Sequence, residues 1–556
     1  MFCSRTGRAN SFVVMVLLAV ALLLLLTFAL YKLNRSGRQS VQSGSSPAST
    51  GNAEPGESMA DLADNGDGLL MYCAAGVRLP VEEIVAAYRK EYGVSVQLQY
   101  GGSNTLLSQL EVAKTGDLYL AADESYTILA KQKGLVRESI PLAVMRPVIA
   151  VRKGNPKQIR GIDDLLRTDI TTALGNSDQA AIGRTTRKLL SRSGHWPRLE
   201  SHVTKTGVFK PTVPEVANDV ALGSVDAAIV WDTTLALYDD LQAIRCPELD
   251  VGAANVMIGV VASSSQPTAA LRFARYLSAS DKGLSIFAKH GFQTVDGDIW
   301  SEVPQLTFFC GSVNRRAVDA VIKEFQQREG VIVNTVYNGC GILTAQMRTI
   351  RNQKQGSGFP DTYMACDRYY LDNVQDWFQD DVDVSDTEVV IAVPKGNPAG
   401  ISSLQDLTKD GMRVAVGQPD QCTIGVLTRQ VLQSEGVYDA VMQNVVTQTA
   451  TSAMLVPSVT TKSVDAALAY ATDTKAEADK VDSIRIGSAA AKAIQPFAIA
   501  RTSQHKQLGK RLYDAVADAR DQFESAGFHF RIDSNSEDSA NSTGSQPSPD
   551  NGPRTP

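Results

Sequence analysis

The sequence carries one pattern twice, in the same order. Met71-Tyr-Cys-Ala-Ala-Gly76 matches Phe308-Phe-Cys-Gly-Ser-Val313, and Lys153-Gly-Asn-Pro156 matches Lys395-Gly-Asn-Pro398. Other matched pairs are Tyr100–Asn104 with Tyr337–Gly341, Asp117–Asp123 with Asp361–Asp367, Gly175–Gly183 with Gly417–Gly425, and Ser224–Ala228 with Ser463–Ala467. Partners lie 237 to 244 residues apart. Solenoid repeats run only about 20–50 residues, so the pattern predicts a duplicated domain.

The two ends of the chain differ in character from the repeats. Phe12–Tyr31 is a run of 20 residues without a charge, long enough for a membrane-spanning helix. A cleavable signal peptide is the alternative, although its apolar core is usually about 7–15 residues. Either interpretation places the rest of the chain outside the cytoplasm. The predicted parts are a membrane anchor (1–33), a flexible linker (34–68), a first binding domain (69–300), a second, diverged one (305–531) and a disordered tail (534–556).

Within each repeat, short β-rich runs alternate with segments of helical periodicity. In the first repeat the predicted strands are 69–73, 94–100, 118–121 and 143–151, and the predicted helices are 81–92 and 105–113. Strands separated by helices indicate parallel βαβ units. The predicted class is therefore α/β, with a doubly wound sheet in each repeat. In such sheets ligands bind beyond the carboxyl ends of the strands.

Glycine-rich loops precede three predicted helices of the first repeat, at 73–79, 101–105 and 176–183. Unpaired backbone N–H groups and the helix dipole make such a loop a site for an anion without any formal positive charge. Glycine also permits a tight turn with no binding role, and for any single loop that explanation is sufficient. Three such loops in one doubly wound unit favour binding.

These residues resemble the molybdate-binding protein family of ABC importers, within the type 2 periplasmic solute-binding superfamily. The resemblance rests on Met71–Val77, Tyr100–Gln109, Asp117–Asp123, Gly175–Leu190 and Gly223–Thr234, and extends over nearly all of 69–296. The second repeat shows the same motifs more weakly. The resemblance implies two lobes that close on a tetrahedral oxyanion held by hydroxyl groups and backbone amides.

The resemblance also implies site residues. In the first repeat, the positions of the two family serines hold Gly76 and Ser103, those of the two backbone amides hold Ile182 and Val216, and that of the tyrosine holds Trp231. In the second repeat the corresponding residues are Val313, Cys340, Ile424 and Tyr470, with Ser312 as a neighbouring hydroxyl. The second site is therefore expected either to bind something else or to serve as packing or a partner surface.

Four of the seven cysteines lie in the second repeat: Cys310, Cys340, Cys366 and Cys422. Outside the cytoplasm a disulfide is permitted, for example between Cys310 and either Cys340 or Cys366. A bond between Cys340 and Cys422 would lock the lobes together. Unpaired buried thiols are the other interpretation. No Cys/His spacing indicates a metal site, and no cofactor is predicted.

Charge and motifs restrict the function further. The net charge of −6 gives no basic surface for nucleic acid, and no catalytic motif is present. The predicted function is a membrane-anchored, extracytoplasmic, non-enzymatic solute-binding protein that captures a molybdate- or tungstate-like oxyanion by lobe closure for a partner ABC permease. The alternative is a tethered oxyanion sensor or scaffold whose second domain does not bind.

Overall fold

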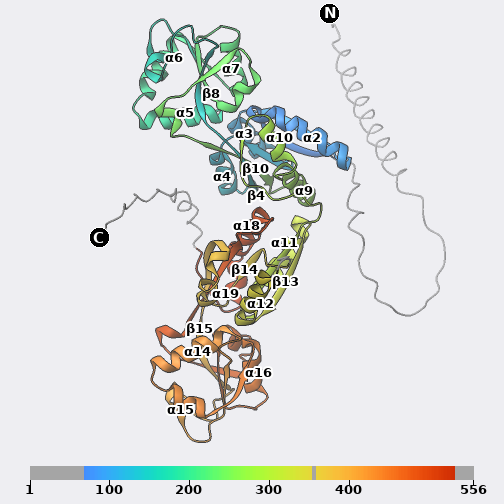
Figure 1. Cartoon of the computed structure of the whole chain (residues 1–556), viewed down its shortest axis with the longest axis vertical. Coiled ribbons are helices and arrows are strands. Elements are labelled where there is room, and N and C mark those ends of the chain that lie inside the picture. Colours follow the sequence, from blue (N-terminus) through green and yellow to red (C-terminus); the bar gives the residue numbers. More distant parts are fainter. Residues whose placement is uncertain (1–67, 354–357, 533–556) are drawn as a thin grey trace, which may run out of the picture. The chain divides into compact units, whose positions relative to one another are not determined.

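The computed structural model describes residues 68–353 and 358–532 (Figure 1). The predicted anchor, nearly all of the predicted linker and the predicted tail lie outside these residues. Within them, no helix is both long and apolar enough to cross a membrane. The described residues form two α/β repeats, and each repeat has its own hydrophobic core.

The first lobe of the first repeat contains a six-stranded mixed sheet, in the order β11-β4-β10-β3-β1-β2. Its strands are β1 (Leu69–Ala74), β2 (Val96–Gly101), β3 (Leu118–Ala121), β4 (Val136–Met145), β10 (Ala254–Val261) and β11 (Gln293–Thr294). Its helices are α2 (Arg78–Tyr92), α3 (Ser103–Ala113), α4 (Glu124–Gln132), α9 (Pro267–Leu277) and α10 (Gly283–Lys289). The first three strands are parallel, as the alternation of strands and helices predicts.

The second lobe of this repeat contains a five-stranded sheet in the order β7-β6-β8-β5-β9. Its strands are β5 (Pro147–Arg152), β6 (Thr172–Gly175), β7 (Val208–Lys210), β8 (Ala227–Trp231) and β9 (Leu241–Ile244). Its helices are α5 (Ala181–Arg192), α6 (Trp196–Thr206), α7 (Val213–Ala221) and α8 (Pro247–Asp250). Here too, parallel strands (β6, β7 and β8) form one side of the sheet.

The sequence prediction needs correction where the chain crosses between the lobes. The predicted strand 143–151 is two strands, because β4 ends at Met145 and β5 begins at Pro147 in the other sheet. β10 pairs antiparallel with both β3 and β4, and β5 pairs antiparallel with β8. The sheets are mixed because the crossing strands enter each lobe against the direction of its parallel strands.

The second repeat follows the same order of elements (Figure 1). Its strands are β12 (Gln305–Gly311), β13 (Ile332–Asn338), β14 (Thr362–Met364), β15 (Phe378–Pro394), β16 (Val414–Gly417), β17 (Val445–Thr449), β18 (Ala466–Tyr470), β19 (Val481–Arg485), β20 (Lys492–Ala500) and β21 (His529–Phe530). Its helices are α11 (Arg315–Glu329), α12 (Cys340–Asn352), α13 (Arg368–Asp372), α14 (Thr423–Ser434), α15 (Tyr438–Gln443), α16 (Leu455–Thr460), α17 (Ala471–Lys475), α18 (Lys506–Ala517) and α19 (Arg520–Ser525).

The second repeat differs from the first at the crossover between its lobes. β15 is continuous over 17 residues and pairs with β20 in one lobe and with β18 and β19 in the other. The two lobes therefore share one ten-stranded sheet. The place in β15 that lies opposite the last residue of β18 has a counterpart in the first repeat, opposite the last residue of β8. The residue there is Pro147, which has no backbone N–H to donate.

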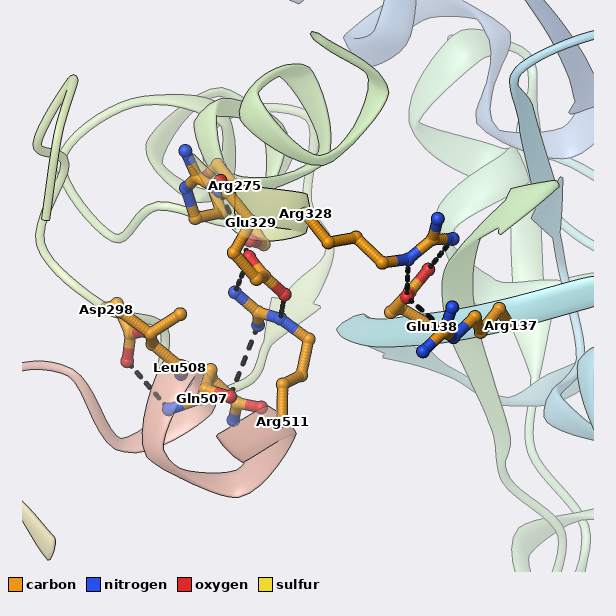
Figure 2. Close-up of polar contacts among 10 residues, drawn as sticks. Arg137, Glu138, Arg275, Asp298, Arg328, Glu329, Gln507, Leu508 and Arg511 are labelled. Atoms are coloured by element: carbon orange, nitrogen blue, oxygen red, sulfur yellow. Dashed lines mark hydrogen bonds and ion pairs between the residues drawn. The ribbon is translucent and has the colours of Figure 1, made fainter. Parts of the chain in front are cut away.

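The two repeats are joined by a buried ion cluster of Arg275, Glu329 and Arg511 (Figure 2). Arg275 lies on α9 of the first repeat, while Glu329 and Arg511 lie on α11 and α18 of the second. Arg275 Nη1 donates to Glu329 Oε2 at 3.0 Å, and Arg511 Nε donates to Glu329 Oε1 at 2.6 Å. The three side chains are at most 8% exposed. Burial alone raises the pKa of Glu329, but Arg511 and Arg275 outweigh it and lower that pKa.

Two further polar contacts connect the repeats beside this cluster (Figure 2). The Asp298 carboxylate accepts hydrogen bonds from the backbone N–H groups of Gln507 and Leu508, at 2.8 and 2.9 Å. It thereby provides an acceptor for two N–H groups in the first turn of α18. Arg328 pairs with Glu138, with Nη2 donating to Oε2 at 3.0 Å. The two repeats are therefore held together by specific polar contacts as well as by the chain that links them.

Replacement of Glu329 by Gln should destabilise the protein strongly. The variant leaves Arg275 and Arg511 buried without a counter-charge, so we expect a loss of about 3–5 kcal/mol in unfolding free energy, measured by urea denaturation at neutral pH. Because the folded-state pKa of Glu329 is depressed, this contribution is present above the unfolded pKa and is lost as the pH falls through the folded one.

The matched control for this variant is Glu324→Gln, on the same helix. Glu324 pairs with Arg137 across 3.0 Å, and both side chains are more than half exposed. Such a surface pair contributes at most about 1 kcal/mol. Equal destabilisation by the two variants would show that the buried cluster has no special role.

Candidate functional site

Four helix starts of the first repeat meet at one cavity between its lobes. They are the 3-10 turn η2 (Ala75–Val77), which leads into α2, and the helices α3, α5 and α7. The cavity is lined by Ala74, Ala75, Gly76, Gly101, Gly102, Ser103, Ala122, Ala180, Ala181, Ile182, Thr212, Val213 and Trp231. Nearly all of these residues lie at, or one or two positions beyond, the carboxyl end of a strand or the start of a helix, where the sequence predicts binding.

None of these four starts is capped by a side chain. Their N-cap residues are Ala74, Gly102, Ala180 and Thr212, and the Thr212 hydroxyl donates instead to Glu215, across 2.7 Å. The N–H groups of a first helical turn have no acceptor within their own helix. No acidic or basic side chain is among the residues that line the cavity. The site therefore presents positive helix ends with no carboxylate among its lining side chains, which suits a small anion.

Ser103 is the first residue of α3 and is buried. The backbone N–H of Ala122 donates to Ser103 Oγ at 3.2 Å, and the Tyr119 hydroxyl donates to the Ser103 carbonyl at 2.8 Å. Because the hydroxyl oxygen acts as the acceptor in the first bond, its own hydrogen remains available to a ligand. Ser103 is thus held by two contacts and can donate into the cavity.

Gly76 and Trp231 come from opposite lobes and face each other. A Cβ atom at position 76 would lie 3.0 Å from Val213 Cγ1 and 3.6 Å from Trp231 Cδ1. Trp231 is 1% exposed. A side chain at position 76 would therefore crowd Val213 and touch the indole of Trp231. The indole N–H can donate a hydrogen bond and cannot accept one.

The two predicted amide positions differ in their placement. Ile182 lines the cavity as the second residue of α5. Val216 does not line it, because it lies within α7 and its N–H donates to the Thr212 carbonyl at 3.2 Å. Thr212 and Val213 take that place. Sequence reasoning missed both, although the sequence Thr212-Val213-Pro214 is a typical helix start.

The lobes of the first repeat touch across the cleft, so the structure is closed. The Asn104 N–H donates to the Gln179 carbonyl at 3.2 Å, and the Asn104 side-chain amide donates to the Asp178 carbonyl at 2.7 Å. Thr185 Oγ1 donates to Asp123 Oδ2 at 2.9 Å. A Cβ atom at Gly102 would lie 2.4 Å from the Gln179 carbonyl oxygen, so this contact requires glycine.

The closed cavity is very small. The space open to the centres of water-sized molecules is about 20 Å³. One such molecule needs about 10–15 Å³, so the cavity suits one or two waters or one compact ion. A sugar or a peptide would not fit between the closed lobes.

The second repeat places its matching residues at equivalent positions of the backbone. Val313 lies in the 3-10 turn η5 (Ser312–Asn314), Cys340 begins α12, Ile424 is second in α14 and Tyr470 ends β18. These four side chains are buried and Ser312 is half-buried. Valine and cysteine stand where the first repeat has glycine and serine, so the shared backbone surrounds a different chemical environment.

All six cysteines of the described residues are free thiols: Cys73, Cys246, Cys310, Cys340, Cys366 and Cys422. The sulfur atoms of Cys340 and Cys366 are in contact. This pair is neither of the two suggested pairs with Cys310, nor the pair of Cys340 and Cys422 that would lock the lobes together. No group of three or more His, Cys, Asp or Glu side chains in the described part of the chain could hold a metal ion.

Comparison with known proteins confirms the resemblance inferred from the motifs. The family model for bacterial extracellular solute-binding protein matches residues 69–293 and again residues 306–529. A binding protein of Haemophilus influenzae is 28% identical over 225 residues, which cover 40% of this chain and 90% of that protein. The molybdate-binding protein ModA of Mycobacterium tuberculosis is 26% identical over 247 residues, which cover 44% of this chain and 90% of that protein.

A solved structure also matches part of the chain. The periplasmic molybdate-binding protein of Azotobacter vinelandii is 14% identical, with 40% of this chain and 98% of that chain covered and a TM-score of 0.35. The two matches of the family model span most of the described residues, one match for each repeat. The chain belongs to the bacterial extracellular solute-binding protein family, as a tandem duplication of its domain.

Proposed function

We propose that the first repeat captures a small tetrahedral dianion, such as molybdate or tungstate, for uptake by an ABC permease. The observation that carries this proposal is the meeting of four helix starts without side-chain caps at one small cavity that has no acidic lining residue. Ser103, Ile182 and Trp231 line this cavity and would donate hydrogen bonds to the anion, as would the backbone beside Gly76. Thr212 and Val213 replace Val216 in the proposed set.

The donor-rich lining also favours one class of anion over another. A fully ionised oxyanion accepts hydrogen bonds at every oxygen, whereas hydrogen phosphate carries a proton that needs an acceptor. No carboxylate lines the cavity to accept that proton. We therefore expect molybdate, tungstate or sulfate to bind better than phosphate. The relatives named as molybdate-binding proteins support the first two.

The partners follow from the family. Relatives are named as binding proteins, which favours uptake over the alternative of a tethered sensor or scaffold. In this proposal Phe12–Tyr31 anchors the protein at the outer face of the membrane, and the linker 34–68 lets the repeats reach a permease that recognises the closed lobes.

Calorimetric titration of the full chain should show binding of molybdate or tungstate at one site. Replacement of Ser103 by Ala removes a hydrogen bond to a charged ligand, which contributes about 1.5–3 kcal/mol, so the affinity should fall about 10- to 100-fold. Ser285→Ala, on the exposed surface of α10, is the control and should bind as the unmodified chain does. If no oxyanion bound, the proposed function would be wrong.

Replacement of Gly102 by Ala should weaken binding by preventing full closure. The added methyl group would meet the carbonyl oxygens of Gln179 and Pro211, at 2.4 and 2.7 Å, so the lobes must stay further apart. A smaller closed population lowers the apparent affinity, and we expect a loss of at least about tenfold in the same titration.

The control for this variant is Gly161→Ala. The only atom within contact distance of a Cβ there is Cys246 Cβ at 3.9 Å, and the backbone of Gly161 is extended, so alanine fits. Hydrogen exchange at the Asn104 amide, which bonds to Gln179, should be faster in Gly102→Ala alone. Unchanged exchange and affinity would show that closure does not depend on this contact.

The proposed anchor predicts where the protein is found in cells. The full chain should sediment with membranes and stay there after a high-salt wash, because an apolar helix of this length is held by the hydrophobic effect. A chain that begins at residue 34, without the predicted anchor, should be released to the soluble fraction. A full chain found in the soluble fraction would contradict the anchor, and a chain cut after the apolar run would support the signal-peptide alternative.

A further inference from the structure

At three positions beside the cleft, the two repeats have different residues although the surrounding sequence matches. Ala74, Ser103 and Ala122 of the first repeat line its cavity, and the second repeat has Gly311, Cys340 and Cys366 there. Two small side chains are thus replaced by larger thiols, and one methyl group beside them is removed. A Cβ atom at Gly311 would lie 2.3 Å from Cys366 Sγ and 2.8 Å from Cys340 Sγ. The glycine is therefore what makes room for the two sulfur atoms.

The sulfur atoms lie in direct contact. Cys340 Sγ and Cys366 Sγ are 2.8 Å apart, and the Cys366 N–H donates to Cys340 Sγ at 3.0 Å. The second contact reproduces the one between the Ala122 N–H and Ser103 Oγ in the first repeat. A disulfide bond is about 2.0 Å long, so the sulfur atoms need to approach by only about 0.8 Å.

We propose that Cys340 and Cys366 are a redox-active dithiol that forms an internal disulfide in the second repeat, with a protein or small-molecule disulfide as the oxidant. This proposal does not depend on oxyanion binding by the first repeat. It assigns a role to a cleft whose side chains no longer match those of an oxyanion site. Extracytoplasmic compartments permit such a bond.

The environment of each thiol predicts which of the two cysteines attacks the external disulfide first. That cysteine is Cys340. Burial raises the pKa of Cys340, but hydrogen bonding by the thiol and the N–H of Cys366 contributes to a net lowering. The pKa of Cys366 is raised by its hydrogen bond to Cys340 and by burial. Cys340 also begins α12, where the helix dipole favours a thiolate.

The exchange is balanced as follows. The Cys340 thiolate attacks one sulfur of the external disulfide, forms a mixed disulfide and releases one thiolate. Cys366 then loses its proton to solvent, attacks Cys340 Sγ and releases the second thiolate. Two protein thiols are oxidised to one disulfide, and the external disulfide is reduced to two thiols.

Cys310 and Cys422, the other two cysteines of the second repeat, contact backbone carbonyl groups. The Cys310 thiol contacts the Gly311 carbonyl at 3.6 Å, and Cys422 Sγ contacts the Gln418 and Thr449 carbonyls at 3.5 Å. Cys340 and Cys366 belong to the same lobe, so their disulfide leaves the lobes free to separate. They are almost fully buried, and the lobes of this repeat touch where the Ile342 N–H donates to the Gln421 carbonyl at 3.3 Å. An external oxidant therefore reaches the two thiols when the lobes open.

The test is to equilibrate the folded full chain with glutathione disulfide, block the remaining thiols and map the disulfides by mass spectrometry after trypsin. Cleavage after Lys and Arg places Cys310, Cys340, Cys366 and Cys422 on four separate peptides, 290–315, 329–348, 355–368 and 414–429. We expect peptides 329–348 and 355–368 to be linked, with a loss of two free thiols that dithiothreitol reverses. A link from Cys340 to Cys310 or Cys422, or no link at equilibrium, would overturn the proposal.

Variants make the assignment specific. The double substitution Cys340→Ser with Cys366→Ala restores the residues of the first repeat and should abolish the thiol loss. Cys422→Ser leaves the pair intact and should lose two thiols as the unmodified chain does. If the double variant does not fold, Cys422→Ser and Cys310→Ala still decide the matter, because persistence of the 329–348 link in both supports the proposal and its loss in either contradicts it.

Discussion

The cleft of the first repeat lies where four helices or helical turns begin, and the backbone N–H groups of those first turns need acceptors. In the first repeat no side chain caps them, and their position beside a small cavity leaves an anion as the natural acceptor. This requirement explains other features of the repeat. The glycine at position 102 allows the lobes to meet, Ser103 adds one more donor, and the absence of lining carboxylates avoids competition for the same N–H groups.

The two repeats show how one backbone can hold two kinds of chemistry. The N–H of residue 122 donates to a serine oxygen in the first repeat, and the N–H of residue 366 donates to a cysteine sulfur in the second. The geometry is the same, but the acceptor has changed from a hydroxyl to a thiol that is placed beside another thiol. The repeats remain joined by a buried Glu329 between two arginines, a contact that belongs to neither cleft.

Much of the fold could be predicted from the sequence because the duplication makes local signals appear twice. The strands at 69–73 and 118–121, the α/β class and the tandem arrangement follow from periodicity and repetition, and the Gly76, Ser103, Ile182 and Trp231 positions come together at one cavity. Three features could not be predicted in this way. The contact of Cys340 with Cys366 and the Arg275–Glu329–Arg511 cluster join segments distant in sequence, and the break at Arg146 depends on the pairing of β4 with β10 and of β5 with β8. Periodicity reports only neighbours along the chain, so it carries no signal for such contacts.

The continuous β15 has a mechanical consequence. In the first repeat the crossover between sheets passes through Arg146, where β4 ends and β5 begins, so the lobes can rotate there without bending a strand. In the second repeat the same position lies inside the continuous β15, where Glu388 pairs with β20 and Val389 with β18, so rotation of the lobes must bend a paired strand. The first repeat is therefore the compliant part of the pair and the second the stiffer one. A membrane partner that touches both would meet two repeats that open in different ways, one at a break between strands and the other by bending a continuous strand.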